Sequence, residues 1–134
     1  MIPVLVDSNV LLDVLTGDPQ WAGWSEKNLS RVADSSSLVI NPLIYAEVSI
    51  RFSRIEDLEA ALPTFLLKRE SIPYEAAFLA GKVYLTYLER GGTRIRPLPD
   101  FFIGAHAAVA GYRLLTRDLG RYTTYFPNLE LISP

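Results

Sequence analysis

Short, continuous apolar runs alternate with longer helical segments along this chain, and the alternation restricts the folds open to it. Runs of this kind are typical of strands buried on both faces of a parallel sheet. We expect strands at residues 2–6, 38–40, 70–72, 112–116 and 129–132. We expect helices at residues 10–15, 20–34, 42–52, 55–68, 74–89 and 100–110. The pattern predicts an α/β fold with a doubly wound, mostly parallel sheet, formed as one domain by residues 1–134.

The stretch from Pro97 to Asp118 indicates which edge of that sheet binds a ligand. Pro99 suits the first turn of a helix and Gly111 suits the position just after its end, so Asp100 begins a helix. A strand follows, and Asp118 comes shortly after it. Because a crossover helix runs antiparallel to its strands, Asp100 and Asp118 should return to the same carboxyl edge. Ligands bind at that edge in open α/β folds.

Two further acids are expected at the same edge. Asp7 directly follows the first apolar run. Asn41 and Pro42 are typical of the cap and the first position of a helix, and Glu47 falls within the apolar arc of that helix. A glutamate on a core-facing side costs stability unless a cation or a metal accompanies it. Asp7 and Glu47 therefore belong with the acids of the preceding stretch.

Carboxylates gathered in one cleft repel one another and raise each other's pKa values, and a divalent cation resolves this repulsion. The acids in question are Asp7, Glu47, Asp100 and Asp118. Oxygen ligands without histidine or cysteine nearby favour Mg²⁺ or Mn²⁺ over zinc. Such an ion can activate water and steady a phosphate during in-line displacement. Thr116 lies two residues before Asp118 and should project from the same side of the strand as Asp118 does. Its hydroxyl can hydrogen-bond an acid or a phosphate.

Each acid also has a purely structural interpretation. Asp7 and Asp100 can be helix N-caps, and Asp118 can be a turn residue. Glu47 can form a surface pair with Arg51, four residues on. We favour the metal-site interpretation because four independent coincidences at one edge are improbable.

Two other titratable residues are not assigned to the acid cluster. Asp13 lies six residues beyond Asp7, so on a helix it points away from it, and we expect Asp13 on a solvated face. His106 is the single histidine and lies in an alanine-rich helix. We expect His106 to be a packed or interface residue and not to bind a ligand.

The composition excludes several classes of protein. The chain has no cysteine, which excludes a disulfide framework and cysteine-ligated metal and fits a reducing compartment. No apolar run approaches the roughly 20 residues of a membrane span, and the N-terminus lacks the basic region of a signal peptide. We therefore expect a cytoplasmic protein without a membrane partner.

Charge is distributed unevenly along the chain. Residues 1–67 hold 9 acids and 4 bases, whereas residues 68–134 hold 6 acids and 9 bases. From residue 90 onward every base is an arginine, whose planar fork can bond two phosphate oxygens. The second half of the chain is therefore suited to phosphate, although a solvated charged surface is an equal alternative from this feature alone.

The ordered set of acidic motifs resembles a known family. The set comprises DSN from Asp7, the helix glutamate Glu47, DFFIGAHA from Asp100 and LLTRD ending at Asp118. Over nearly the full chain it resembles the PIN-domain ribonucleases, with the strongest likeness to the toxin of VapBC-type toxin–antitoxin modules. The resemblance implies a three-layer α/β/α sandwich, RNA cleavage with Mg²⁺ or Mn²⁺, a homodimer and a small antitoxin partner. It also implies that Asp7, Asp100 and Asp118 hold the metal and that Glu47 completes the site or positions water, with Thr116 in support.

A metal-dependent endoribonuclease toxin is therefore the expected function. Arg94, Arg96 and Arg117 are expected to hold RNA phosphates, and the antitoxin is expected in an apolar groove near the helices 74–89 and 42–52. The alternatives are a phosphatase or DNA-directed nuclease that uses the same metal edge, a non-toxin PIN-like nuclease, and a non-catalytic module that binds protein. The sequence names neither the RNA target nor the antitoxin.

Overall fold

The computed structural model describes residues 1–96 and 98–134, so Pro97 of the expected ligand-binding stretch lies outside the described residues. Within the described part of the chain, five parallel strands form one sheet in the order β3-β2-β1-β4-β5. The strands are β1 (Val4–Val6), β2 (Leu38–Ile40), β3 (Leu67–Arg69), β4 (Arg113–Leu115) and β5 (Leu131–Ile132). The prediction of a mostly parallel sheet is confirmed.

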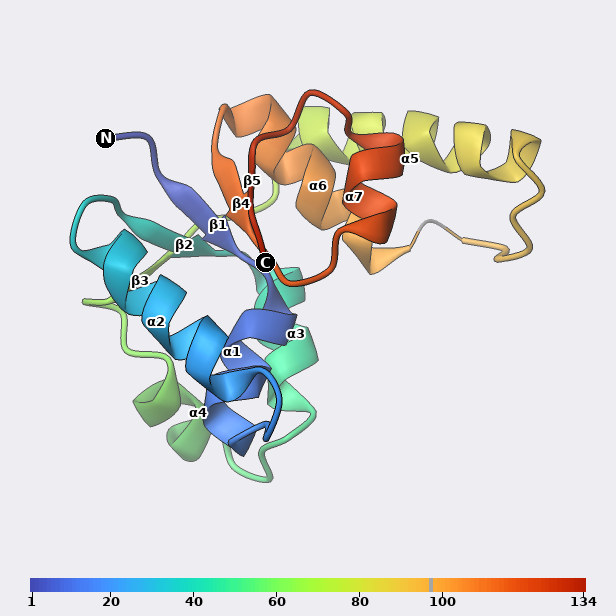
Figure 1. Cartoon of the computed structure of the whole chain (residues 1–134). Helices are drawn as coiled ribbons and strands as arrows, with labels where there is room; N and C mark the ends of the chain where they lie inside the picture. Colours follow the sequence, from blue (N-terminus) through green and yellow to red (C-terminus); the bar gives the residue numbers. More distant parts are fainter. Residues whose placement is uncertain (97) are drawn as a thin grey trace.

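Helices cover both faces of this sheet (Figure 1). The helices are α1 (Ser8–Thr16), α2 (Ala22–Ala33), α3 (Pro42–Ser49), α4 (Ile55–Ala61), α5 (Tyr74–Glu89), α6 (Pro99–Ala110) and α7 (Gly120–Tyr125). Helices α1 to α4 lie on one face, and α5 to α7 lie on the other. The fold is therefore the expected three-layer α/β/α sandwich. None of the described helices is long and apolar enough to cross a membrane.

Local sequence signals account for most element boundaries. The carboxamide of Asn41 accepts the Ile44 N–H at 2.9 Å and caps α3, whose first residue is Pro42. Gly111 ends α6 with a φ of 74°, in the left-handed region that only glycine adopts at low cost. The residues of β1 are fully buried, as expected for a strand covered on both faces.

The third strand lies elsewhere than the apolar pattern predicted. We expected it at residues 70–72, after a helix at 55–68; instead α4 ends at Ala61 and β3 begins at Leu67. Pro63 follows the end of α4 and cannot continue a helix. In β3 only Leu67 is buried, so this edge strand is not a continuous apolar run that would mark it in the sequence.

The strand order places a topological switch point between β1 and β4. The chain leaves β1 toward β2 over one face of the sheet and leaves β4 toward β5 over the other, so the order reverses between these neighbours. In open α/β sheets ligands bind at such a switch point, outside the carboxyl ends of the strands. The Asp7 N–H donates to the Leu115 carbonyl at 2.9 Å and brings the ends of the two strands together.

Candidate functional site

Asp7 is the buried centre of the polar groups at this switch point. It lies at the end of β1 and is only 3% exposed. Its Oδ2 accepts hydrogen bonds from the Thr116 hydroxyl and from the Tyr122 hydroxyl, both at 2.9 Å. Asp7 occupies the N-cap position of α1, but among the described residues no α1 N–H donates to its side chain, so its carboxylate does not cap the helix.

Thr116 connects Asp7 to the segment that follows β4. It is fully buried, and its hydroxyl donates to Asp7 while accepting from Asn9 Nδ2 at 3.2 Å and from the Asp118 N–H at 3.1 Å. A hydroxyl has one proton to donate and two lone pairs to accept with, so all of its capacity is used. Thr116 therefore fixes Asp7 relative to the backbone of Asp118.

Glu47 lies close to the segment that carries Asp7. It lies on α3, is half-buried, and accepts the Ser8 hydroxyl at 2.9 Å. The alternative in which Glu47 forms a surface pair with Arg51 is therefore not the arrangement found in the described structure. Ser8 begins α1 directly after Asp7, so one hydrogen bond joins the two acid-bearing segments.

Asp100 and Asp118 lie nearer to solvent and are held by α7 and its start. Asp100 is in the first turn of α6; its Oδ2 lies 3.5 Å from Arg121 Nη1, and its Oδ1 lies 3.5 Å from the Tyr122 hydroxyl. The side chain of Asp118 is exposed, and its Oδ1 accepts the Gly120 N–H at 3.2 Å. In this conformation Asp118 thus serves as the turn residue that starts α7.

Burial perturbs the ionisation of the central acid. It raises the pKa of Asp7 from its ordinary value of 3.8 to about 6, although the hydrogen bonds from Thr116 and Tyr122 oppose the rise. The charges of Asp100 and Glu47 raise the pKa of Asp7 further. Mutual repulsion was expected, but removal from water is the larger cause.

The outer acids show the same effect. Burial raises the pKa of Glu47, and the charge of Asp100 adds to the rise while the Ser8 hydrogen bond opposes it. Burial also raises the pKa of Asp100, with Arg121 opposing and the charge of Asp118 adding. Asp7, Glu47 and Asp100 thus act on one another electrostatically, and Asp118 acts on Asp100.

The donor atoms of this cluster suit a hard divalent cation. They are carboxylate oxygens, which Mg²⁺ and Mn²⁺ prefer, and burial leaves their negative charge poorly solvated. In the conformation of residues 1–96 and 98–134, however, no three acidic, histidine or cysteine side chains are grouped closely enough to hold one ion. Asp100 instead lies beside Arg121, and Asp118 accepts a hydrogen bond at the start of α7.

The arginines expected to bind phosphate occupy two different environments. Arg94 and Arg96 are exposed in the loop between α5 and α6. This loop is anchored to α5, because the Tyr84 hydroxyl donates to the Arg94 carbonyl at 2.7 Å. Arg117 instead places its Nε 2.7 Å from Asp13 Oδ2 and its guanidinium over the Trp21 ring.

The expectation that Asp13 is solvated is wrong. Asp13 is only 2% exposed, and it also accepts the Ser25 hydroxyl at 2.8 Å. The periodicity argument considered only the direction relative to Asp7 and overlooked α2 and the segment after β4, which cover this side of α1. Asp13 and Arg117 thus form a largely buried ion pair between α1 and that segment.

The prediction that His106 is a packed residue is confirmed. His106 is fully buried in α6, and its Nδ1 lies 3.0 Å from Asn41 Nδ2. Burial lowers the pKa of His106, with the carboxylate of Glu70 opposing from 3.7 Å. The imidazole is therefore part of the packing between α6 and the start of α3.

Sequence reasoning overlooked Tyr122 and underused Arg121. Both are on α7 and contact the acids of the site, yet the sequence analysis assigned no element to their segment. The available signal was the spacing of Tyr122 and Phe126, which are four residues apart and would share one face of a helix. Both are buried in the structure.

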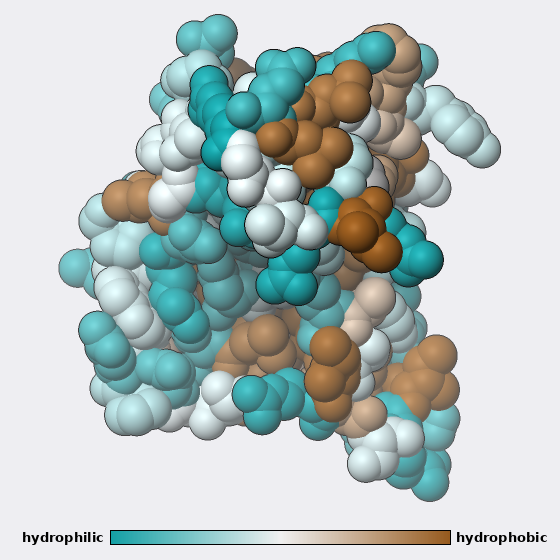
Figure 2. Space-filling view, turned by 90° about the vertical axis from the view of Figure 1, so that its right-hand side faces the viewer, coloured by the Kyte–Doolittle hydropathy of each residue, from teal (hydrophilic) through white to brown (hydrophobic). Residues whose placement is uncertain are grey.

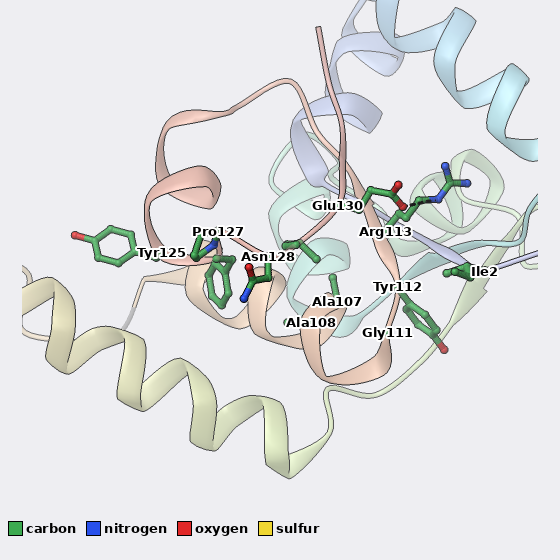
Figure 3. A pocket seen from close by; sticks show the side chains of 12 residues that line it. Ile2, Ala107, Ala108, Gly111, Tyr112, Arg113, Tyr125, Pro127, Asn128 and Glu130 are labelled. Atoms are coloured by element: carbon green, nitrogen blue, oxygen red, sulfur yellow. Dashed lines mark ion pairs between the residues drawn. The ribbon is translucent and has the colours of Figure 1, made fainter.

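A cavity of about 420 Å³ lies at the opposite edge of the sheet (Figure 3). Residues that line it include Ile2, Tyr112, Pro127 and the ion pair Arg113–Glu130, whose closest atoms are 3.7 Å apart. These residues precede or flank the amino ends of β1 and β4. The cavity is therefore separate from the acid cluster.

The sequence matches the profile of the PIN domain family over residues 4–126. A search of curated protein sequences finds no match. The fold is similar to VapBC2 from Rickettsia felis bound to a promoter DNA fragment, with a TM-score of 0.75, 19% identity and 98% of each chain covered. It is similar to VapBC-1 from nontypeable Haemophilus influenzae, with a TM-score of 0.73, 17% identity and 98% of each chain covered. It is also similar to VapC20 of Mycobacterium tuberculosis, described as a sarcin–ricin loop cleaving toxin, with a TM-score of 0.61 and 14% identity over 98% of this chain and 99% of that one. The family match spans most of the chain and the shared fold agrees with it, so this chain belongs to the PIN domain family.

Proposed function

We propose that this protein is a Mg²⁺- or Mn²⁺-dependent endoribonuclease and the toxin half of a toxin–antitoxin module. The observation that carries the proposal is the buried Asp7, which shares the β1–β4 switch point with Glu47 and Asp100 in a PIN-family fold. A buried and electrostatically coupled set of carboxylates costs stability, and a divalent cation is the partner that offsets this cost. The similarity to VapBC complexes supports the toxin assignment.

Asp7, Asp100 and Asp118 are the residues that would hold the ion. A bound Mg²⁺ or Mn²⁺ supplies a water of lowered pKa and neutralises charge on a phosphate. Glu47, fixed by Ser8, completes the site or orients the attacking water. The water oxygen forms a bond to phosphorus, the bond to the 3′ oxygen breaks, and the products carry 5′-phosphate and 3′-hydroxyl ends.

The cation competes with Arg121 for Asp100 in this proposal. The guanidinium lies 3.5 Å from Asp100 Oδ2, and its positive charge partly neutralises the carboxylate. In this proposal the phosphate contacts come from the exposed arginines 94 and 96, in the loop that leads to Asp100. Arg117 is less available for a phosphate contact, because its guanidinium is paired with the carboxylate of Asp13.

The partners of the proposal are RNA, an antitoxin and a second copy of the chain. Tyr74 and Phe78 of α5 are 92% and 68% exposed and supply apolar surface for a protein partner. Tyr84 and Tyr87 of the same helix instead anchor the loop after α5, and Tyr87 packs on Phe101. Apolar side chains also lie in separate patches among hydrophilic ones on the face shown in Figure 2.

The decisive test compares Asp7→Asn with a matched control. Asp7→Asn should abolish Mn²⁺-dependent cleavage of RNA while the protein stays folded. Asp57→Asn removes an exposed carboxylate on α4 and should cut at the wild-type rate. Cleavage by Asp7→Asn at the wild-type rate would show that the site is wrong, and activity on DNA or phosphate esters but not on RNA would favour the phosphatase or DNA-nuclease alternative.

Co-expression tests the toxin assignment separately. The gene alone should arrest growth, and the neighbouring small open reading frame should relieve the arrest and its product should copurify. A chain that is harmless alone but cleaves RNA in vitro would be a non-toxin PIN nuclease. A chain without metal-dependent stabilisation in a thermal melt would be a non-catalytic binding module.

A further inference from the structure

Tyr122 is a fully buried tyrosine whose hydroxyl reaches two of the acids. It lies on α7, 2.9 Å from Asp7 Oδ2 and 3.5 Å from Asp100 Oδ1. A tyrosine has one proton to donate, and hydroxyl donors lie about 2.7–2.8 Å from their acceptors. The hydrogen bond therefore goes to Asp7, and Asp100 is a neighbour in contact.

The two oxygens of Asp7 have unequal surroundings. Oδ2 accepts from both Tyr122 and Thr116 at 2.9 Å, and Asn9 Nδ2 is a more distant third donor at 3.4 Å. Oδ1 has only the Ser8 hydroxyl, at 3.5 Å, and that hydroxyl donates to Glu47 at the shorter distance of 2.9 Å. The rotation of the Asp7 carboxylate is thus set from the Oδ2 side, and Oδ1 is the oxygen left available.

We infer that Tyr122 is a positioning residue: together with Thr116 it holds Oδ2 of Asp7, so that Oδ1 is the oxygen presented to a divalent cation. The inference rests on the proposed metal site and adds a residue that the acidic motifs do not contain. It also gives α7 a role, since consecutive residues of this helix, Arg121 and Tyr122, reach Asp100 and Asp7.

Packing between α6 and α7 makes this placement firm. Phe126, at the end of α7, lies so close to Gly104 of α6 that a Cβ built there would meet its ring at 2.5 Å. Tyr125 packs its ring on Phe101, with the centroids 5.3 Å apart. The position of the Tyr122 hydroxyl is therefore determined by contacts along the whole helix.

The test compares Tyr122→Phe with Tyr125→Phe. Both changes remove one hydroxyl from α7 and keep the ring, and only the first removes a donor to Asp7. Calorimetric titration with MnCl₂ at pH 8 should show about tenfold weaker binding for Tyr122→Phe, the loss typical when a group that orients a metal ligand is removed. Tyr125→Phe should bind as the wild type does, and for Tyr122→Phe kcat on RNA should fall while KM stays unchanged.

A double variant separates positioning from general destabilisation. Thr116 and Tyr122 act on the same oxygen, and either donor alone still restrains it. The loss of Mn²⁺ affinity in Thr116→Val/Tyr122→Phe should therefore exceed the product of the two single losses. The inference would be overturned if the loss of Mn²⁺ affinity in the double variant only equalled the product of the two single losses. It would also be overturned if Tyr122→Phe bound Mn²⁺ and cleaved RNA as the wild type does. Either result would leave the proposed function standing. Absence of Mn²⁺ binding to the wild-type protein would overturn both.

Discussion

At the scale of single residues, Asp7 is held at a cost to the stability of the metal-free protein. Its pKa is about 6 in the folded protein against an ordinary 3.8, so the folded state binds the proton more tightly than the unfolded state does. The stability that this proton contributes is complete below pH 3.8 and is lost as the pH rises through about 6. Protons and a cation are therefore alternative ways to neutralise the same carboxylate.

Asp7→Asn should consequently be more stable than the wild type at pH 7.5 in the presence of a chelator. The difference in the free energy of unfolding should reach about 3 kcal/mol, since each pKa unit corresponds to about 1.4 kcal/mol. It should shrink toward pH 4, where Asp7 is protonated in the folded state and partly protonated in the unfolded state. Urea unfolding of both proteins from pH 4 to pH 8 measures it, and a difference that does not change with pH would contradict the assigned cause.

At the scale of secondary-structure elements, the ion pair between Asp13 and Arg117 connects α1 to the segment after β4. Arg117→Ala should lower the free energy of unfolding by about 3 kcal/mol, because it leaves a carboxylate that is 2% exposed without its cation. Adding Asp13→Asn should restore part of the loss, since the buried charge is then gone. Arg94→Ala, at an exposed position, is the control and should change stability by less than about 0.5 kcal/mol. Equal stabilities of the two arginine variants in urea would contradict the buried pair.

The contact between α6 and α7 gives a second prediction at this scale. Gly104→Ala should destabilise the protein by about 1–3 kcal/mol, because its methyl group would collide with the ring of Phe126. Gly81→Ala is the matched control within α5; no atom lies within 4 Å of its new methyl group, so its helix propensity should make it neutral or slightly stabilising. Thermal melts of both variants test this. Equal melting temperatures would show that α7 does not depend on a close approach to α6.

At the scale of the whole molecule, charge is divided between the two halves of the chain. The second half carries the positive excess, and the exposed arginines 94 and 96 lie in the loop that leads to Asp100. If RNA phosphates bind there, the logarithm of the association constant should fall with the logarithm of salt concentration at a slope of about −0.7 per contact. Replacing both arginines with alanine should weaken RNA binding and flatten this slope while leaving Mn²⁺ binding intact. An unchanged slope in a fluorescence titration would place the RNA path elsewhere.

The sequence by itself determined the class of fold and the edge of the sheet at which Asp7 and Asp100 lie. Buried apolar strands, the cap formed by Asn41 and the helix end at Gly111 are local signals, because short-range backbone geometry decides them. A parallel sheet with crossover helices then brings Asp7 and Asp100 to one edge through topology alone. That is why a one-dimensional pattern was sufficient to expect the acids to lie together.

Only the tertiary structure decided what surrounds those acids. The shortest hydrogen bonds to Asp7 come from positions 116 and 122, and the ion-pair partner of Asp13 comes from position 117, so no local pattern contains these pairs. The position of β3 was also missed, since an edge strand is held by backbone hydrogen bonds and needs only one buried side chain, Leu67. Periodicity states which way a side chain points along its own element, whereas burial and pairing depend on what packs against that element from elsewhere in the chain.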